Sequence, residues 1–287
     1  VSHPFSSHVI ANSLKRKYPS LTWILDNGDP FSPLEESQPN NFFLFRSLNK
    51  KIENSYLNHG SYFCVTTEET KEIYKNCFKE DINKIKVIGP LLSHEAFKAF
   101  GNNVQKHNEE LIFSFVGTIY KNLRHPAVPI QIIDSLIKDK DINACFNFYG
   151  ETNDVDISVL STEKLKLNFY GQVSRKEALR VMNQSDFLIN IGNSTTYQLP
   201  SKTIEYLASQ KPIINFSSTA KDSSSKLLKK FEGTLDLNYK EQSLEECEEK
   251  LSKFIEVSGF PQRTAIVRNL EEFEIKHVSS EYQNLFS

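Results

Sequence analysis

Residues 191–216 read IGNSTTYQLPSKTIEYLASQKPIINF, and this stretch decides the fold class. An apolar run ends at Ile191, and a polar loop extends from Gly192 to Leu199. Pro200 then suits the first turn of a helix, because its fixed φ is helical and its missing N–H is not needed there. The apolar run 212–216 reads as a buried strand. Strand, loop, helix and strand in this order predict one βαβ unit of a parallel sheet.

The same alternation continues on both sides of this unit. Short β-branched or aromatic runs are separated by stretches with helical periodicity, which is typical of a parallel sheet covered by helices on both faces. The strands expected in the second half are Leu111–Val116, Ala144–Tyr149, Leu165–Tyr170, Phe187–Ile191, Pro212–Phe216 and Thr234–Leu237. They predict a doubly wound domain of about 150 residues.

The first half of the chain shows the same pattern with fewer strands. An apolar helical pattern over Phe5, Val9, Ile10 and Leu14 opens it, and strands are expected at 21–25, 61–65 and 84–88. We therefore expect an α/β protein with two Rossmann-like domains, of which the first lacks its opening strands. The expected bounds are 1–105, 106–260 and a helical segment 261–287, for which a return to the first domain is one option.

Composition excludes several classes of function. The 34 basic and 36 acidic residues give a net charge of −2, which does not favour a nucleic-acid partner. No two glycines are closer in the sequence than Gly89 and Gly101. The P-loop and the G-x-G-x-x-G fingerprint are therefore absent, because both need glycines close together. No carboxylate cluster has metal-ligand spacing, so we expect neither a metal nor another cofactor. The first thirty residues lack a signal-peptide layout, so we expect a cytoplasmic protein.

Ligands of open parallel sheets bind at the carboxyl ends of the strands, so the loops that follow the strands hold the candidate site. In residues 113–126, FSFVGTIYKNLRHP, Gly117 would let a ligand approach the backbone closely. Lys121 and Arg124 could neutralise a diphosphate, Arg124 through a bidentate fork. A tight turn with two solvated cations is the alternative interpretation.

The turn from Gly171 to Val173 is the second candidate, because its backbone groups could meet the edge of a nucleobase. Ser174 and Glu177 follow with the spacing of a capping box, which is the simpler role for that pair. Asp186 precedes a strand and is interpreted as a structural partner rather than as an acid catalyst.

The third candidate is the helix start at Ser201, Lys202 and Glu205. Free N–H groups and the helix dipole favour a phosphate at such a place, and Lys202 adds a full charge. Glu205 can accept two hydroxyl protons, as a ribose diol would require. In the alternative interpretation Ser201 caps the helix, Lys202 is solvated and Glu205 complements the dipole.

A family resemblance favours the functional interpretation of these residues. PSKTIEYLASQKPIINF (200–216), preceded by LNFYGQVSRKEALRVMNQSDFLINI (167–191), resembles the carboxyl-terminal domain of bacterial GT-B glycosyltransferases of family 4. FSFVGTIYKNLRHP resembles the first strand and loop of that domain. SHPFSSHVIANSLKRKYPSLTWILDNGDPF (2–31) and VTTEETKEIY (65–74) resemble parts of the amino-terminal domain, so the resemblance covers nearly the whole chain.

The resemblance implies a GT-B architecture, in which two Rossmann-like domains face each other across a cleft. It also implies that Arg124 and Lys202 hold the donor diphosphate, that Glu205 holds the ribose, and that the turn 171–173 holds the base. One position departs from the family. Many relatives carry two glutamates with seven residues between them, and Tyr197 stands where the first would be. Backbone N–H groups from Asn193 and Ser194 onward could contact the donor sugar instead.

For catalysis on the first domain, Asp29 in the loop DNGDPFS and His8 in SHPFSSH are the candidates, with a solvated loop as the alternative for each. The implied function is a retaining transfer of sugar from a UDP-, GDP- or dTDP-sugar to a glycan or lipid-linked acceptor in cell-envelope polysaccharide synthesis. The alternatives are a non-catalytic nucleotide-sugar-binding subunit and a sugar-nucleotide epimerase. Lys15–Lys17 and Lys50–Lys51 predict contact with the inner membrane face. The sequence does not determine sugar, base, acceptor or linkage.

Overall fold

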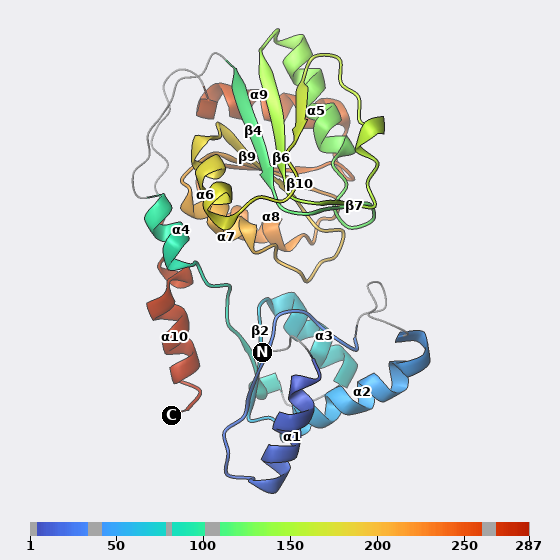
Figure 1. Cartoon of the computed structure of the whole chain (residues 1–287), viewed down its shortest axis with the longest axis vertical. Coiled ribbons are helices and arrows are strands. Elements are labelled where there is room, and N and C mark those ends of the chain that lie inside the picture. The colour runs from blue at the N-terminus through green and yellow to red at the C-terminus, as the bar shows by residue number, and fades with distance from the viewer. Residues whose placement is uncertain (1–4, 34–41, 79–81, 101–109, 260–267, 287) are drawn as a thin grey trace. The chain divides into compact units, whose positions relative to one another are not determined.

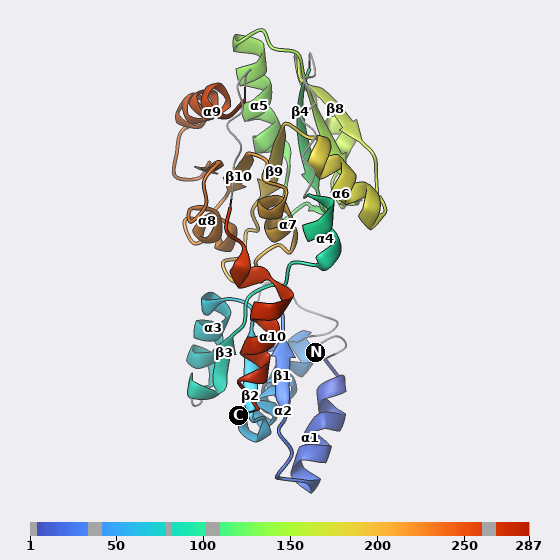
Figure 2. The same cartoon turned by 90° about the vertical axis from the view of Figure 1, so that its left-hand side faces the viewer.

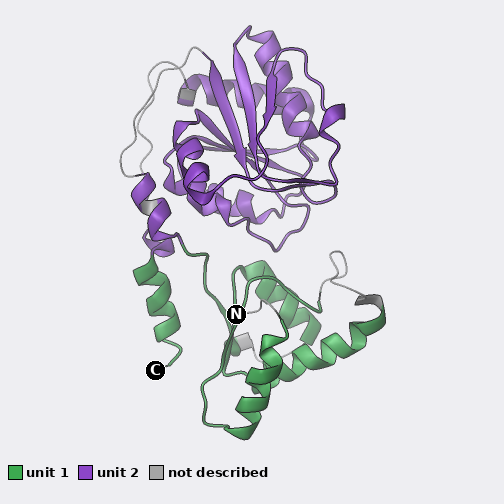
Figure 3. Ribbon diagram, viewed as in Figure 1, with its two compact units in different colours: residues 1–91, 275–287 green, residues 92–274 purple. Residues whose placement is uncertain are grey.

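The computed structural model describes residues 5–33, 42–78, 82–100, 110–259 and 268–286. It divides into two compact units, each with its own parallel sheet (Figure 3). Unit 1 comprises residues 1–91 and 275–287, and unit 2 comprises residues 92–274. The predicted α/β class with two parallel-sheet domains is therefore confirmed.

Six strands form the main sheet in the described part of unit 2 (Figure 1). Their order is β11-β10-β9-β4-β6-β8, and every neighbouring pair is parallel. The strands are β4 (Leu111–Val116), β6 (Ala144–Tyr149), β8 (Lys166–Phe169), β9 (Phe187–Ile191), β10 (Ile213–Ser217) and β11 (Thr234–Asn238). Two short strands, β5 (Ile119–Tyr120) and β7 (Thr152–Asn153), pair separately. All six predicted strands are present, so the doubly wound prediction is confirmed.

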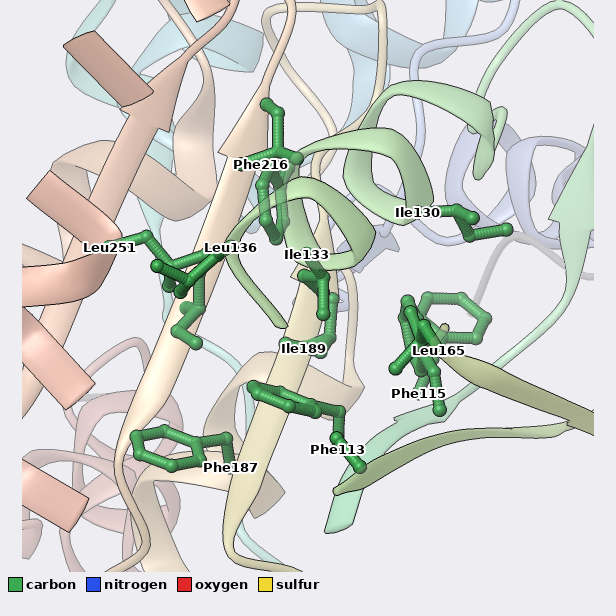
Figure 4. Packing of buried hydrophobic residues seen from close by; sticks show 14 of the residues in the cluster. Phe113, Phe115, Ile130, Ile133, Leu136, Leu165, Phe187, Ile189, Phe216 and Leu251 are labelled. Atoms are coloured by element: carbon green, nitrogen blue, oxygen red, sulfur yellow. The ribbon is translucent and has the colours of Figure 1, made fainter. Parts of the chain in front are cut away.

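Helices cover both faces of this sheet. One face packs against α5 (Ala127–Asp139) and α9 (Leu244–Gly259). The other packs against α4 (His94–Ala99), α6 (Arg175–Gln184), α7 (Lys202–Ala208) and α8 (Ser223–Leu228). Figure 4 shows part of the core on the first face, where Ile133 of α5 and Leu251 of α9 lie near Phe187 and Ile189 of the sheet. Each such side chain contributes about 1.5–3 kcal/mol by burial, which holds the strand ends in place.

Unit 1 has a three-stranded parallel sheet in the order β1-β2-β3. The strands are β1 (Ile24–Asn27), β2 (Tyr62–Val65) and β3 (Ile85–Val87), and the helices are α1 (Ser7–Lys17), α2 (Phe42–His59), α3 (Glu68–Phe78) and α10 (Ile275–Gln283). Side chains of α2 and α3 pack with Leu25 and Phe63. Val278 of α10 packs with Cys64 instead, so the end of the chain returns to unit 1 (Figure 2). Short 3₁₀ helices cover Ile82–Lys84, Ile157–Val159 and Glu271–Phe273.

The boundary between the units lies between residues 91 and 92, not between 105 and 106 as expected from the sequence. The reason is α4, whose Ala96 packs with Leu179 and Met182 of α6 in the core of unit 2. Residues 100–110 are polar and lack apolar periodicity, which predicts a connection between domains, and they lie almost entirely outside the described residues. The segment expected as 261–287 is divided between the units, because residues up to 274 belong to unit 2 and residues 275–287 belong to unit 1. Arg268 donates to the carbonyls of Leu207, Lys211, Glu232 and Gly233 and so holds residues 268–274 to unit 2.

Among the helices in the described ranges, none combines the length and the apolarity that crossing a membrane demands.

Candidate functional site

The loops after β4 and β9 lie at the carboxyl edge of the unit 2 sheet, at its topological switch point. β4 lies between β6 and β9, and the chain continues from β4 to β6 on one side before it crosses to β9 on the other. The helices that follow therefore diverge, because α5 covers one face of the sheet and α7 the other. Such a switch point is where open α/β sheets bind ligands. Gly117, Arg124, Asn193 and Ser194 are among the predicted residues that lie in these two loops.

Hydrogen bonds join the two loops directly. Arg124 donates from Nε and Nη2 to Oδ1 of Asn193, over 3.1 and 2.6 Å. The backbone N–H of Ser194 donates to the carbonyl of Leu123 over 2.9 Å, and the Ser194 hydroxyl donates to the carbonyl of Asn122 over 3.2 Å. The structure thus brings the predicted residues Arg124, Asn193 and Ser194 together, while their role in a donor site stays a prediction.

The surroundings of Arg124 keep its guanidinium half-buried. Burial lowers the pKa of Arg124, although nearby Tyr206, Tyr120 and Asp222 act in the opposite direction. Nη1 lies 3.4 Å from the carbonyl oxygen of Thr118. The contact on Nη1 is long, so this end of the fork can turn toward a stronger anionic acceptor.

Gly117 lies beside that fork. A Cβ built on Gly117 would come within 3.2 Å of the Phe115 ring, which is a tight contact, and would touch Nη1 of Arg124 at the ordinary contact distance of 3.5 Å. Gly150, at φ +143°, is closer still, because its Cβ would lie 2.0 Å from the Gly117 carbonyl oxygen. These two glycines let the ends of β4 and β6 approach each other. Lys121, also predicted, is exposed in the same loop.

Lys202 and Glu205, the residues predicted at the start of α7, contact each other. Nζ of Lys202 lies 2.6 Å from Oε2 of Glu205. Glu205 is only 8% exposed. Ser201 is exposed, has helical backbone angles and makes no capping hydrogen bond, so the alternative in which it caps the helix is wrong.

Arg175 completes this cluster, and the sequence analysis missed it. Its Nη2 lies 3.0 Å from Oε1 of Glu205, and its Nε lies 3.0 Å from Oε2 of Glu95. Arg175 is the first residue of α6, and Glu205 belongs to α7. Its position in the sequence could have pointed to this site, because a cation directly after the predicted cap Ser174 lies at the same sheet edge as the start of α7.

The turn predicted to meet a base lies between β8 and α6. Gly171 has φ +69°, which glycine adopts without strain, and its carbonyl accepts from the N–H of Gly150 over 2.7 Å. Val173 is half-buried against the core beneath α6. Ser174 accepts from the N–H of Glu177 over 3.2 Å, so its predicted capping role is confirmed.

An aromatic pair flanks this turn. The rings of Tyr149 and Tyr170 stack with centroids 4.6 Å apart and an interplanar angle of 5°. Tyr170 is exposed. The predicted structural role of Asp186 is confirmed as well, because its Oδ2 accepts from the N–H of Ile112 over 2.8 Å at the opposite edge of the sheet.

Tyr197, which stands where many members of the resembled family carry a glutamate, is 6% exposed, so its phenol is a buried side chain. A carboxylate that the sequence analysis did not select lies against Gly192, in the same loop. Oδ1 of Asp222 would be 2.9 Å from a Cβ on Gly192, directly below the loop that follows β9. Its Oδ2 accepts from the N–H of Ser225 over 2.8 Å, which makes Asp222 the cap of α8. Burial raises the pKa of Asp222.

The two candidates in unit 1 have very different surroundings. His8 is 3% exposed and packs against the rings of Phe5, Trp23 and Tyr56. Burial lowers its pKa. In this structure His8 is a core side chain, and the catalytic role predicted for it would require it to leave that core. Asp29 is exposed in the loop after β1.

A buried carboxylate fixes the loop that carries Asp29. Glu53 is fully buried and accepts hydrogen bonds from the N–H of Ser32 over 2.8 Å and from the hydroxyl of Tyr74 over 2.6 Å. Burial raises the pKa of Glu53, although these donors act against the rise. The sequence analysis missed Glu53, because a glutamate inside a helical pattern normally indicates a solvated face.

Among the described residues, no three His, Cys, Asp or Glu side chains are grouped so that they could hold a metal ion. The predicted metal-free site therefore remains a prediction.

Comparisons with known proteins give a fold but no sequence family. No protein-family model and no curated protein matches the sequence. HepE from Anabaena, solved with UDP and glucose, superposes with a TM-score of 0.66 at 11% identity, over 98% of this chain and 75% of that chain. WaaB, a lipopolysaccharide outer core galactosyltransferase, gives 0.60 at 12% identity, over 98% and 72%. TarM gives 0.59 at 14% identity, over 92% and 49%.

These solved structures are GT-B glycosyltransferases, and the chain has their fold. The predicted GT-B architecture is thus confirmed, whereas membership of family 4 stays a prediction. The chain spans about half the length of TarM and about three quarters of that of HepE.

Proposed function

We propose that this chain is a glycosyltransferase that transfers a sugar, with retention of configuration, from a nucleotide-sugar donor to a glycan or lipid-linked acceptor. The observation that carries the proposal is the hydrogen-bonded pair Arg124 and Asn193 at the switch point of a GT-B sheet. HepE, of the same fold, has been solved with UDP-glucose as well as with UDP and glucose.

The donor binds along the carboxyl edge of the unit 2 sheet. Arg124 and Lys202 neutralise the diphosphate, because a guanidinium fork and an ammonium give charge-assisted hydrogen bonds to phosphate oxygens. Glu205 receives the ribose hydroxyls, and the turn from Gly171 to Val173 presents backbone groups to the base. The nucleotide is thus held by side chains and backbone groups of one unit.

The reaction breaks the bond between the sugar C1 and the donor phosphate oxygen and forms a bond from C1 to an acceptor hydroxyl oxygen. The departing phosphate oxygen takes the proton of that hydroxyl, so no dedicated protein nucleophile is required. Arg124 and Lys202 stabilise the negative charge that develops on the leaving diphosphate. Asp29 in unit 1 is the remaining candidate for orienting the acceptor.

The acceptor belongs to the cell envelope and is reached at a membrane surface. WaaB is a lipopolysaccharide outer core galactosyltransferase, WaaG is a glycosyltransferase involved in lipopolysaccharide biosynthesis, and both share the fold. In unit 1 the helices α1 and α2 expose large apolar side chains, with Ile10 68% and Leu44 70% exposed. Arg16, Lys17 and Lys50 lie on the same two helices, and such a mixture suits an anionic lipid surface.

Thermal unfolding with UDP, GDP, dTDP and their sugar conjugates tests the proposal. A ligand at one hundred times its dissociation constant stabilises the folded state by about 2.7 kcal/mol, so one nucleotide of the panel should raise the melting temperature clearly. The matching nucleotide sugar should then be slowly hydrolysed in the absence of acceptor. A panel in which no nucleotide stabilises the protein would overturn the proposal.

Tyr197 supports a second candidate, a nucleotide-sugar-binding subunit without catalysis. A buried phenol offers neither the charge nor the basicity of a carboxylate near the transferred sugar. Stabilisation by a nucleotide sugar together with no hydrolysis of it would favour this candidate. Turnover of the same compound would exclude it.

A further inference from the structure

Arg175 connects the first turn of α4 to the first turn of α7. Its guanidinium reaches Glu95 Oε2 from Nε over 3.0 Å and Ser93 Oγ from Nη2 over 2.5 Å on one side. On the other side Nη2 reaches Oε1 of Glu205 over 3.0 Å. Three helices that follow different strands thus meet at one side chain.

The two oxygens of Glu205 are held separately. Arg175 contacts Oε1 and Lys202 contacts Oε2. A carboxylate oxygen has two lone pairs, so each oxygen keeps one for a further donor. The carboxylate is therefore oriented by protein cations and still able to accept from two neighbouring hydroxyl groups, which is the number in a ribose diol.

The helix α4, which contacts Arg175, is anchored in the core of unit 2. α4 carries Ser93 and Glu95 and is anchored in the core of unit 2 through the buried side chains of Ala96 and Phe100. Ser93 also caps α4 by accepting from the N–H of Ala96 over 3.2 Å. Arg175 lines a surface groove of about 780 Å³ between α4 and α6, while Glu205 behind it is nearly buried. The contact with Glu205 is thus the less solvated end of Arg175.

We propose that Arg175 is a positioning residue of the donor site, which sets the direction of the Glu205 carboxylate toward the ribose. The inference rests on the proposed function. Arg175 itself touches neither the diphosphate nor the base, so its effect on binding passes through Glu205 alone. Without Arg175, the Glu205 carboxylate keeps its contact with Lys202. The Lys202 ammonium then draws the carboxylate away from the diol.

The test compares Arg175→Ala, Arg175→Lys and a control on the same helix, Arg180→Ala. Arg180 is exposed and bonds only to Glu177 and Gln184 of its own helix in the described structure, so its removal leaves Glu205 untouched. UDP, GDP and dTDP are titrated by calorimetry, and whichever the wild type binds is used with pyrophosphate as the ribose-free probe. Circular dichroism and melting temperatures establish that each variant is folded.

We expect Arg175→Ala to weaken nucleoside diphosphate binding roughly five- to twentyfold, which corresponds to the interaction energies typical of residues in contact. Pyrophosphate binding should change by less than about twofold. Arg175→Lys, which keeps the charge and loses the fork, should lie between Arg175→Ala and the wild type. In a Glu205→Gln background, Arg175→Ala should add almost no further loss, because the residue it orients has already lost its charge.

The outcomes separate the two proposals. A wild type that binds none of the three nucleotides overturns the proposed function and this inference with it. A wild type that binds, with Arg175→Ala binding equally well, overturns only the inference. Equal losses for nucleotide and pyrophosphate, or a loss that persists in the Glu205→Gln background, would show that Arg175 contacts phosphate itself and is no positioning residue.

Discussion

Nζ of Lys202 lies 2.6 Å from Oε2 of Glu205, so the two residues expected to hold different parts of one nucleotide contact each other. An ammonium has three donors and can keep the carboxylate while it turns another N–H toward phosphate. The pair is partly shielded from water, which strengthens it relative to an exposed pair. Lys202 and Glu205 are therefore parts of one preorganised unit.

The first prediction concerns Glu205. Glu205→Gln keeps the shape of the side chain but loses the anion, and one of its terminal atoms becomes a donor that faces Lys202 or Arg175. We expect binding of ribose-containing nucleotides to fall roughly tenfold or more, by the strength of hydrogen bonds to charged groups. Inhibition by pyrophosphate should stay nearly intact. Calorimetry with both ligands measures the difference, and a parallel loss for both would contradict the ribose assignment.

His8 provides a prediction about pH. Burial lowers its pKa from 6.5, so the unfolded chain binds a proton at higher pH than the folded chain does. Stability therefore falls as the pH falls from above 6.5 toward the pKa of the folded state, by about 1.4 kcal/mol for each tenfold difference in proton affinity. His8→Phe should unfold with a weaker dependence on pH between 7.5 and about 5.

Urea unfolding at several pH values checks this prediction, with His277→Phe on α10 as the control because His277 is exposed. If His8→Phe and the wild type lose stability in parallel as the pH falls, His8 titrates as an exposed histidine and the packed position is wrong.

The sheets and the loops at their carboxyl edges could be predicted because their signals are local. Apolar runs marked β4, β9 and β10, and Pro200 marked the start of α7 to within two residues. The contact between Arg175 and Glu205 could not be predicted, since it depends on how two helices that follow different strands approach each other. No spacing along the chain encodes that distance.

The helix α1 shows why burial is harder to predict than periodicity. Its sequence shows a helical pattern of the apolar residues Val9, Ile10 and Leu14, which would suit a buried face. The structure buries His8 instead and leaves those three side chains exposed. The aromatic side chains of Trp23 and Tyr56, which come from elsewhere in the sequence, decide which face of α1 is covered.

A further prediction concerns metal dependence. Arg124 and Lys202 supply cationic groups for the diphosphate, so transfer should continue after EDTA treatment with unchanged rate. Rates are measured before and after chelation, and after Mn²⁺ or Mg²⁺ is returned. Activity that vanishes with EDTA and returns with either ion would mean that a divalent cation carries the charge instead.

Membrane binding is predicted to depend on α1. Arg16→Glu together with Lys17→Glu should reduce flotation with anionic vesicles, since each cation near such a surface contributes about 1 kcal/mol. Lys15 is left unchanged, because its Nζ donates to the carbonyl of Pro19 over 2.7 Å and so supports the end of the helix. Lys230→Glu together with Lys240→Glu, at two exposed positions of unit 2, is the control, because it lowers the net charge by the same amount. Equal flotation of all three proteins, or none with the wild type, would contradict this role of α1.

Calorimetric titration of a nucleoside diphosphate into the wild type and Lys202→Ala tests the donor site most directly. Lys202→Ala removes a charge-assisted contact worth about 1.5–3 kcal/mol, so affinity should fall roughly ten- to a hundredfold. Circular dichroism of the variant excludes unfolding as the cause. An unchanged affinity in folded Lys202→Ala would mean that the start of α7 is not the diphosphate site, and it would contradict the proposed donor site.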